Sequence, residues 1–147
     1  MIKVLFICHG NICRSPMSEY IMKDILNKHG ASGDFVIESA ATSREELGKD
    51  IYPPAKACLR AHGIPFEGRI ARHMTESDFE EYDYIIAMEN YNIVNLRRMF
   101  GDSSKYSLIL DYTANPGDIS DPWYSGDFET TYAEIERGCL GLFDKIK

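Results

Sequence analysis

The chain has 147 residues, of which 44% are hydrophobic and 27% charged, as in an ordinary globular protein. This length predicts a single domain, residues 1–147, with one substantial core. The 16 lysines and arginines against 23 acidic residues give a net charge of −7 with no basic block, which argues against a nucleic-acid partner. No stretch approaches the roughly 20 apolar residues of a membrane span, and the N-terminal apolar run is too short for a signal peptide. A cytoplasmic protein without a membrane partner is therefore expected.

The N-terminal segment predicts a strand, a loop and a helix in succession. Residues 2–7 form a short β-branched and aromatic run, typical of a buried strand, and the run ends at Cys8. Ser15 is expected to cap the helix that follows, with Pro16 at the first helical position. The apolar stripe of this helix stops near Gly30.

Strand and helix signals alternate along the rest of the chain. Short β-branched and aromatic runs predict three further strands, at residues 35–37, 84–88 and 106–110. Proline or capping residues predict helices after Pro53, Thr75 and Asn90, and an apolar stripe predicts a helix at 128–146. This alternation predicts an α/β fold of the flavodoxin-like, doubly wound kind, in which a four-stranded parallel sheet carries helices on both faces.

The loop between the first strand and the first helix carries the strongest chemical signal. Cys8 and Arg14 are separated by five residues, and Ser15 follows directly. In open α/β sheets ligands bind beyond the carboxyl ends of the strands, where Cys8 is expected. The backbone N–H groups of the loop, aided by the flexible Gly10, are expected to converge on one oxyanion beside a helix N-terminus. The sequence therefore predicts a phosphate-binding loop with a nucleophile inside it.

The residue types in this loop, together with the distant Asp121, also predict a reaction. A cysteine attacks phosphorus only as a thiolate, and the helix N-terminus, the loop amides and Arg14 all favour the Cys8 anion. The planar guanidinium of Arg14 binds two phosphate oxygens at once. Asp121 is expected to protonate the leaving group and then to act as a base toward water. Pro122 is expected to keep this acidic segment in a loop.

These motifs resemble those of a known family. The segments 8–15 and 121–124, with the stretches 39–43 and 60–65 between them, look like the low-molecular-weight protein tyrosine phosphatases over essentially the whole chain. The resemblance implies hydrolysis of protein phosphotyrosine and small aryl phosphates through a phosphocysteine intermediate, without a cofactor, and phosphate or other oxyanions as competitive ligands. It also implies that Asn11, Ser15 and Ser39 hold the loop by hydrogen bonds and that Ser15 stabilises the Cys8 thiolate.

Residues around the loop are expected to set the substrate preference. Trp123 and Tyr124 provide walls for an aromatic ring. His9 is expected at the pocket mouth, where its protonated form adds positive charge. Four positions depart from the family pattern. Trp123 stands where tyrosine is common, His9 where a small or apolar residue is common, and Glu45 where an aromatic residue is common, and Glu45 is expected to alter the substrate preference. Arg69 stands where histidine is usual, so the hydrogen-bond support for Asn11 is expected to be arranged differently.

The other cysteines and the histidines need separate interpretations. Cys13 lies on the same loop as Cys8, and it either traps oxidised Cys8 as a disulfide or packs inward. Cys58 and Cys139 lie on apolar helix faces, which favours core packing. The four histidines show no metal-ligand spacing, so no metal site and no metal-dependent phosphatase are predicted.

Three other functions fit the sequence less well than phosphotyrosine hydrolysis. Arsenate reductases share the fold and the cysteine loop but need two further redox cysteines close together, and this chain has none between Cys58 and Cys139. Phosphatases acting on phosphoarginine tend to have threonine where this chain has Ile12, which favours phosphotyrosine. A non-catalytic phosphate-binding module is expected to lack the nucleophile or the acid, whereas Cys8 and Asp121 are both present.

Overall fold

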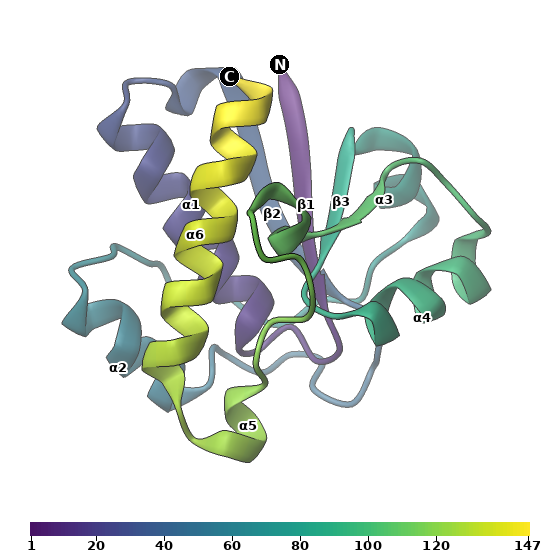
Figure 1. Ribbon diagram of the computed structural model, residues 1–147. Coiled ribbons are helices and arrows are strands. Elements are labelled where there is room, and N and C mark those ends of the chain that lie inside the picture. The colour runs from purple at the N-terminus through teal and green to yellow at the C-terminus, as the bar shows by residue number, and fades with distance from the viewer.

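A computed structural model describes all 147 residues and contains one sheet of four parallel strands between helices (Figure 1). The strands are β1 (Ile2–Cys8), β2 (Phe35–Ala41), β3 (Tyr84–Ala87) and β4 (Tyr106–Leu108). Their order in the sheet is β2-β1-β3-β4. β2 is therefore added on one side of β1 and β3 on the other, and the point where the strand order reverses lies between β1 and β3. The predicted parallel α/β architecture is confirmed, and its strand order is that of flavodoxin-like folds.

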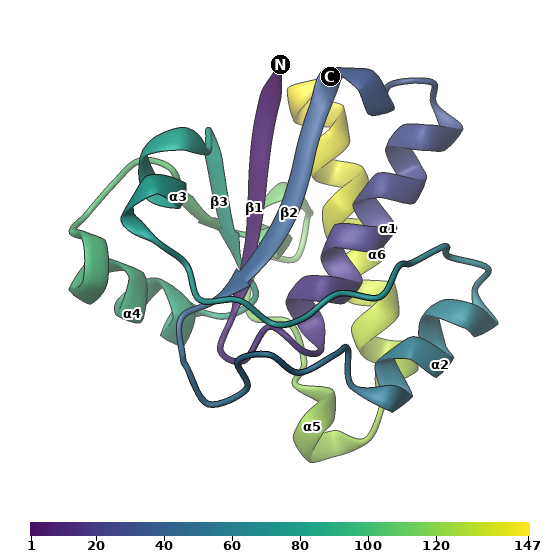
Figure 2. The same ribbon diagram turned by 180° about the vertical axis from the view of Figure 1, so that it is seen from behind.

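Helices cover both faces of the sheet. They are α1 (Arg14–Lys28), α2 (Pro53–Ala61), α3 (Glu76–Glu81), α4 (Asn90–Phe100), α5 (Pro122–Ser125) and α6 (Phe128–Ile146), with 3-10 helices at Ser32–Asp34 and Ile109–Tyr112. α1 and α6 lie side by side on one face, and α3 and α4 lie on the other (Figures 1 and 2). No helix combines the length and the apolar character needed to cross a membrane.

The central strand β1 is covered on both faces, which explains why its sequence is a continuous apolar run. Val4 and Phe6 belong to the large core beneath α1 and α6. Leu5 and Ile7 belong to a second cluster, which α3 and α4 cover. Side chains alternate between the two faces of a strand, so a strand covered on both faces is apolar at every position. This buried strand holds Cys8 rigidly at its carboxyl end.

Three predicted boundaries near the strands and the first helix are wrong. β2 continues to Ala41, beyond residue 37, because its polar residues also pair with β1. The fourth strand ends at Leu108, after which the chain turns into a 3-10 helix. α1 begins at Arg14, with Cys13 at the N-cap, so Ser15 is not the cap and Pro16 is the third helical residue. The Ser15 hydroxyl is engaged by the loop, which removes it from capping.

Other caps also differ from the sequence prediction. Thr75 caps α3 as predicted, with a reciprocal pair of hydrogen bonds to Asp78. α4 has Glu89 at its N-cap, and Asn90 is the first helical residue. The Asn92 side-chain oxygen accepts from the Glu89 backbone N–H, and the Glu89 carbonyl oxygen accepts from the Asn92 backbone N–H. The segment after Asp121 was expected to be a loop, but it forms the one-turn helix α5.

Two glycines allow α6 to approach the 3-10 helix at Ile109–Tyr112. A Cβ atom on Gly141 would lie 2.0 Å from the backbone oxygen of Tyr112, and one on Gly138 would lie 2.4 Å from the Ile109 side chain. The Tyr112 backbone cannot move away without shifting the 3-10 helix to which it belongs. Gly141→Ala is therefore expected to lower the free energy of unfolding by about 2–3 kcal/mol in urea denaturation. Gly33→Ala, with nothing within 4 Å of the added atom, is the matched control. A similar loss in both variants would contradict the packing explanation.

Candidate active site

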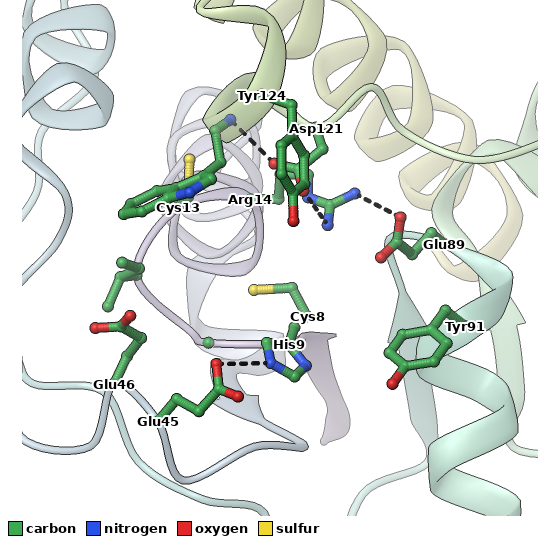
Figure 3. Close-up of a pocket in the computed structure, with 13 residues that line it drawn as sticks. Cys8, His9, Cys13, Arg14, Glu45, Glu46, Glu89, Tyr91, Asp121 and Tyr124 are labelled. Carbon is green, nitrogen blue, oxygen red and sulfur yellow. Dashed lines mark hydrogen bonds and ion pairs between the residues drawn. The ribbon is translucent and has the colours of Figure 1, made fainter.

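A pocket opens at the carboxyl edge of the sheet, between β1 and β3, where open α/β sheets bind their ligands (Figure 3). The loop after β1 contributes six lining residues, namely Cys8, His9, Gly10, Ile12, Cys13 and Arg14. Later segments contribute the others, namely Glu45, Glu46, Glu89, Tyr91, Asp121, Trp123 and Tyr124. The structure therefore brings Cys8, Arg14 and Asp121 into one pocket, although Asp121 is far away in the sequence.

A chain of hydrogen bonds reaches the Cys8 sulfur from the interior side of the loop. The Asn11 side-chain amide donates to the Ser15 hydroxyl oxygen at 2.8 Å and to that of Ser39 at 3.0 Å. The Ser15 oxygen lies 3.0 Å from Cys8 Sγ, and because it already accepts from Asn11, its own proton is free to point at the sulfur. The Asn11 backbone N–H also donates to Sγ, at 3.3 Å. Donors aimed at a sulfur favour the thiolate over the thiol.

Asn11 holds the shape of the loop, and Arg69 holds Asn11. Asn11 is fully buried and has φ of 59°, the left-handed region that asparagine tolerates better than most residues. Arg69 Nη1 donates to the Asn11 carbonyl oxygen at 2.7 Å, and Arg69 Nη2 donates to Asn11 Oδ1 and to Ser39 Oγ. The Arg72 backbone N–H donates to the same Asn11 Oδ1. The loop support in this chain thus includes a guanidinium at position 69.

Arg14 is buried beside two carboxylates, with 4% of its surface exposed. Nη1 donates to the Ile119 carbonyl oxygen at 3.0 Å and to Glu89 at 3.3 Å, and Nη2 lies 3.5 Å from Asp121 Oδ2 (Figure 3). Burial alone would lower the pKa of Arg14, but the hydrogen bond with Glu89 and the nearby Cys8 and Asp121 charges keep this pKa above its ordinary value. The guanidinium is therefore fixed in orientation and remains charged.

Glu89 is a site residue that the sequence analysis missed. It directly precedes α4, just past the carboxyl end of β3, and β3 is the neighbour of β1 in the sheet. Because the carboxyl ends of parallel strands meet at one edge, an acidic residue just after a predicted strand is a signal that was present in the sequence. Tyr91 and Glu46 also line the pocket and were not predicted to do so.

Asp121 has two separate contacts. Its Oδ1 accepts a hydrogen bond from the Trp123 backbone N–H at 3.0 Å, which caps α5. Its Oδ2 faces Arg14 inside the pocket. The side chain is 29% exposed, so water and substrate reach the carboxylate. The hydrogen bond that caps α5 therefore fixes Oδ1, and Oδ2 faces the pocket.

The rim of the pocket carries exposed aromatic rings and acidic groups. Trp123 is 53% exposed and packs against the Tyr52 ring at 4.8 Å between centroids, whereas Tyr124 is 86% exposed. On another side of the rim, His9 Nε2 lies 3.2 Å from Glu45 Oε2. The four rim residues expected from the sequence, namely His9, Glu45, Trp123 and Tyr124, all line this pocket.

All four cysteines are free thiols. Cys13 is buried at the pocket wall, and burial together with the neighbouring Cys8 charge raises the pKa of its thiol well above the ordinary value. Cys58 in α2 and Cys139 in α6 belong to the large core and do not line the pocket, which confirms their predicted core packing.

Comparisons with known proteins agree with this geometry. The family model of low molecular weight phosphotyrosine protein phosphatases matches residues 3–147. The low molecular weight protein-tyrosine-phosphatase YfkJ of Bacillus subtilis is 40% identical over 100% of this chain and 97% of its own length. The human low molecular weight phosphotyrosine protein phosphatase is 35% identical over 97% of this chain and 94% of its own.

Solved structures show that related proteins share this fold. The crystal structure of YfkJ matches the fold with a TM-score of 0.95 at 41% identity, covering 99% of this chain and 94% of that one. The crystal structure of a Drosophila arginine phosphatase has a TM-score of 0.91 at 29% identity, covering 99% of this chain and 98% of that one. The chain belongs to the low molecular weight phosphotyrosine protein phosphatase family.

Proposed function

We propose that this protein hydrolyses phosphotyrosine in proteins, and small aryl phosphates, with residues 1–147 acting as one catalytic domain. The observation that carries the proposal is the pocket in which two donors point at the Cys8 sulfur while Arg14 and Asp121 stand beside it. A nucleophile, an oxyanion clamp and an acid are the three groups that phosphomonoester transfer to a cysteine requires.

In the first step Cys8 Sγ attacks phosphorus, and the bond from phosphorus to the tyrosine oxygen breaks. The Arg14 guanidinium and the backbone N–H groups of the loop hold the non-bridging oxygens as their charge redistributes. Asp121 gives its proton to the departing phenolate oxygen. The products of this step are a phosphocysteine, a free tyrosine side chain and an Asp121 carboxylate.

In the second step the Asp121 carboxylate takes a proton from water, and the water oxygen attacks phosphorus. The sulfur–phosphorus bond breaks, which regenerates the Cys8 thiolate and releases inorganic phosphate. Glu89 supports both steps because it pairs with Arg14 and fixes the direction of the guanidinium. Inorganic phosphate and similar oxyanions fit the same loop and therefore compete with the substrate.

A set of phosphopeptides with one common sequence tests the substrate class. Phosphotyrosine is expected to be cleaved with a kcat/KM at least about tenfold above phosphoserine and phosphoarginine, because Trp123 and Tyr124 line the pocket and offer aromatic surfaces to the tyrosine ring. Equal rates on all three would refute the tyrosine preference. A higher rate on phosphoarginine would assign the protein to the activity named for its Drosophila structural relative.

The charge of the pocket mouth predicts a further preference among phosphotyrosine peptides. Glu45 has a side chain that is 71% exposed, and its one ion-pair partner is His9. We expect lysine beside the phosphotyrosine to give a kcat/KM roughly two- to fivefold above glutamate there, as for exposed ion pairs. Glu45→Gln should reduce this ratio, whereas Glu80→Gln on α3, which removes the same charge away from the pocket, should not. An unchanged ratio in Glu45→Gln would contradict this preference.

We also propose that Cys13 protects oxidised Cys8. Peroxide converts the Cys8 thiolate to a sulfenic acid, and Cys13 then forms a disulfide with it and releases water. Inactivation by hydrogen peroxide is expected to be reversed by dithiothreitol in the native protein and to become largely irreversible in Cys13→Ser. Full recovery in both proteins would contradict a role for Cys13.

We also propose a cytoplasmic location for the protein. The reaction needs Cys8 as a free thiolate, and a reducing compartment preserves it in this form. The four free thiols of the structure support this proposal. Fractionation of the native host, followed by detection of the protein, tests it.

A further inference from the structure

Outside the catalytic pocket, three possible metal ligands meet between α2 and α6. Cys58 and His62 lie four residues apart at the end of α2, and this spacing places them on one helix face. Glu129 comes from the first turn of α6. The Cys58 sulfur, a His62 ring nitrogen and a Glu129 carboxylate oxygen all lie within 4.8 Å of one another.

The spacing of these three atoms is close to that around a tetrahedral zinc ion. Zinc bonds of about 2.0–2.3 Å place neighbouring ligand atoms about 3.3–3.7 Å apart. Cys58 Sγ lies 3.8 Å from Glu129 Oε1, and His62 Nε2 lies 2.7 Å from Glu129 Oε2. Small rotations of the two exposed side chains are therefore enough to open the His62–Glu129 hydrogen bond around an ion.

The surroundings hold these groups in place and leave one side open. The His62 ring stacks on Tyr132, with 3.7 Å between the ring centroids and 9° between their planes. The Cys58 side chain is buried, whereas His62 and Glu129 are exposed. An ion at this point would have three protein ligands and one position facing solvent for a water molecule.

We propose that Cys58, His62 and Glu129 form a binding site for Zn²⁺, separate from the catalytic pocket. A sulfur, an imidazole nitrogen and a single carboxylate suit zinc, whereas magnesium and calcium prefer oxygen ligands alone. As the zinc–sulfur bond forms, the thiol proton is released to solvent. The ion would lie outside the catalytic pocket, because none of its three ligands lines that pocket.

Zinc at this site would tie α2 to α6 close to the rim of the catalytic pocket. Cys58 Sγ lies 3.7 Å from the carbonyl oxygen of Phe128, whose ring stacks on Tyr52. Tyr52 in turn packs against Trp123 of the rim. The expected effect is therefore greater stability of the region that supports the Trp123 wall.

The test uses Co²⁺ as a spectroscopic substitute for Zn²⁺, in the full chain carrying Cys8→Ser so that the catalytic thiolate cannot bind metal. One equivalent of Co²⁺ is expected to produce a thiolate-to-cobalt charge-transfer band that Zn²⁺ abolishes by displacement. Cys58→Ser in this background should remove the band, and Glu129→Gln should weaken binding about tenfold or more. The melting temperature should rise with Zn²⁺ only where Cys58 is present.

Matched cysteine variants decide the outcome. Cys13→Ser and Cys139→Ser in the same background should keep the band, because these thiols lie outside the cluster. Far-ultraviolet circular dichroism checks that each variant is folded. Glu129→Gln changes an exposed residue, so it tests the site without altering the core. Persistence of the band in Cys58→Ser, or no band with a several-fold excess of Co²⁺, would overturn the proposal.

Discussion

Replacement of Cys8 by serine is expected to abolish turnover of an aryl phosphate, with a loss of at least about 10⁴-fold in kcat. The hydrogen bonds that reach the sulfur from Ser15 and Asn11 stabilise a thiolate, but they cannot remove the proton of a much less acidic hydroxyl. Cleavage of para-nitrophenyl phosphate at neutral pH measures the loss.

The same variant is expected to keep its phosphate site. The loop amides and Arg14 remain in place, so inorganic phosphate should still bind to Cys8→Ser in isothermal titration calorimetry. Cys139→Ala is the matched control, since it removes a thiol from the core of α6 away from the pocket and should leave kcat unchanged. Turnover by Cys8→Ser within tenfold of the native protein would exclude the phosphocysteine mechanism.

The fold was predictable because its signals are local. The continuous apolar run of β1 reflects burial on both faces, and the capping sequence at Thr75 reflects contacts within one helical turn. The alternation of strands and helices then restricts the topology to a parallel sheet with crossovers. Wrong boundaries occur where contacts with distant segments compete with local preference, as in β2, which pairing with β1 extends to Ala41.

The candidate active site was only partly predictable, because some of its contacts join segments that are distant in the sequence. Cys8 and Arg14 lie six positions apart at the two ends of one loop, and this pattern is visible directly in the sequence. Glu89 lies 75 positions from Arg14 and reaches it because β3 pairs with β1. Arg69 supports Asn11 from 58 positions away through a segment without regular secondary structure, for which no periodicity exists to read.

The cluster between α2 and α6 was also only partly predictable from the sequence. The spacing of Cys58 and His62 places them on one helix face, which the sequence alone indicates. Glu129 joins them only because α6 packs beside α2, 67 positions later than His62. A search for zinc motifs of fixed spacing therefore passes over this group.

Replacement of Asp121 by asparagine is expected to lower kcat by about 10²–10³-fold for substrates with poor leaving groups, the usual value of a general acid. Asparagine keeps the oxygen that caps α5 through the Trp123 N–H, so the helix and the rim should remain in place. It has no acidic proton to donate to the departing oxygen. The variant therefore removes proton transfer while it preserves the local structure.

A series of aryl phosphates with leaving groups of increasing basicity separates the two roles of Asp121. In the native protein kcat should depend weakly on the leaving group, because the carboxylic acid protonates it in the transition state. In Asp121→Asn the rate should fall steeply as the leaving group becomes more basic, and the loss should be smallest for para-nitrophenyl phosphate. Asp121→Ala removes the cap as well, so its extra loss over Asp121→Asn measures the contribution of α5. A uniform decrease across the series in Asp121→Asn would mean that Asp121 positions Arg14 and does not transfer the proton.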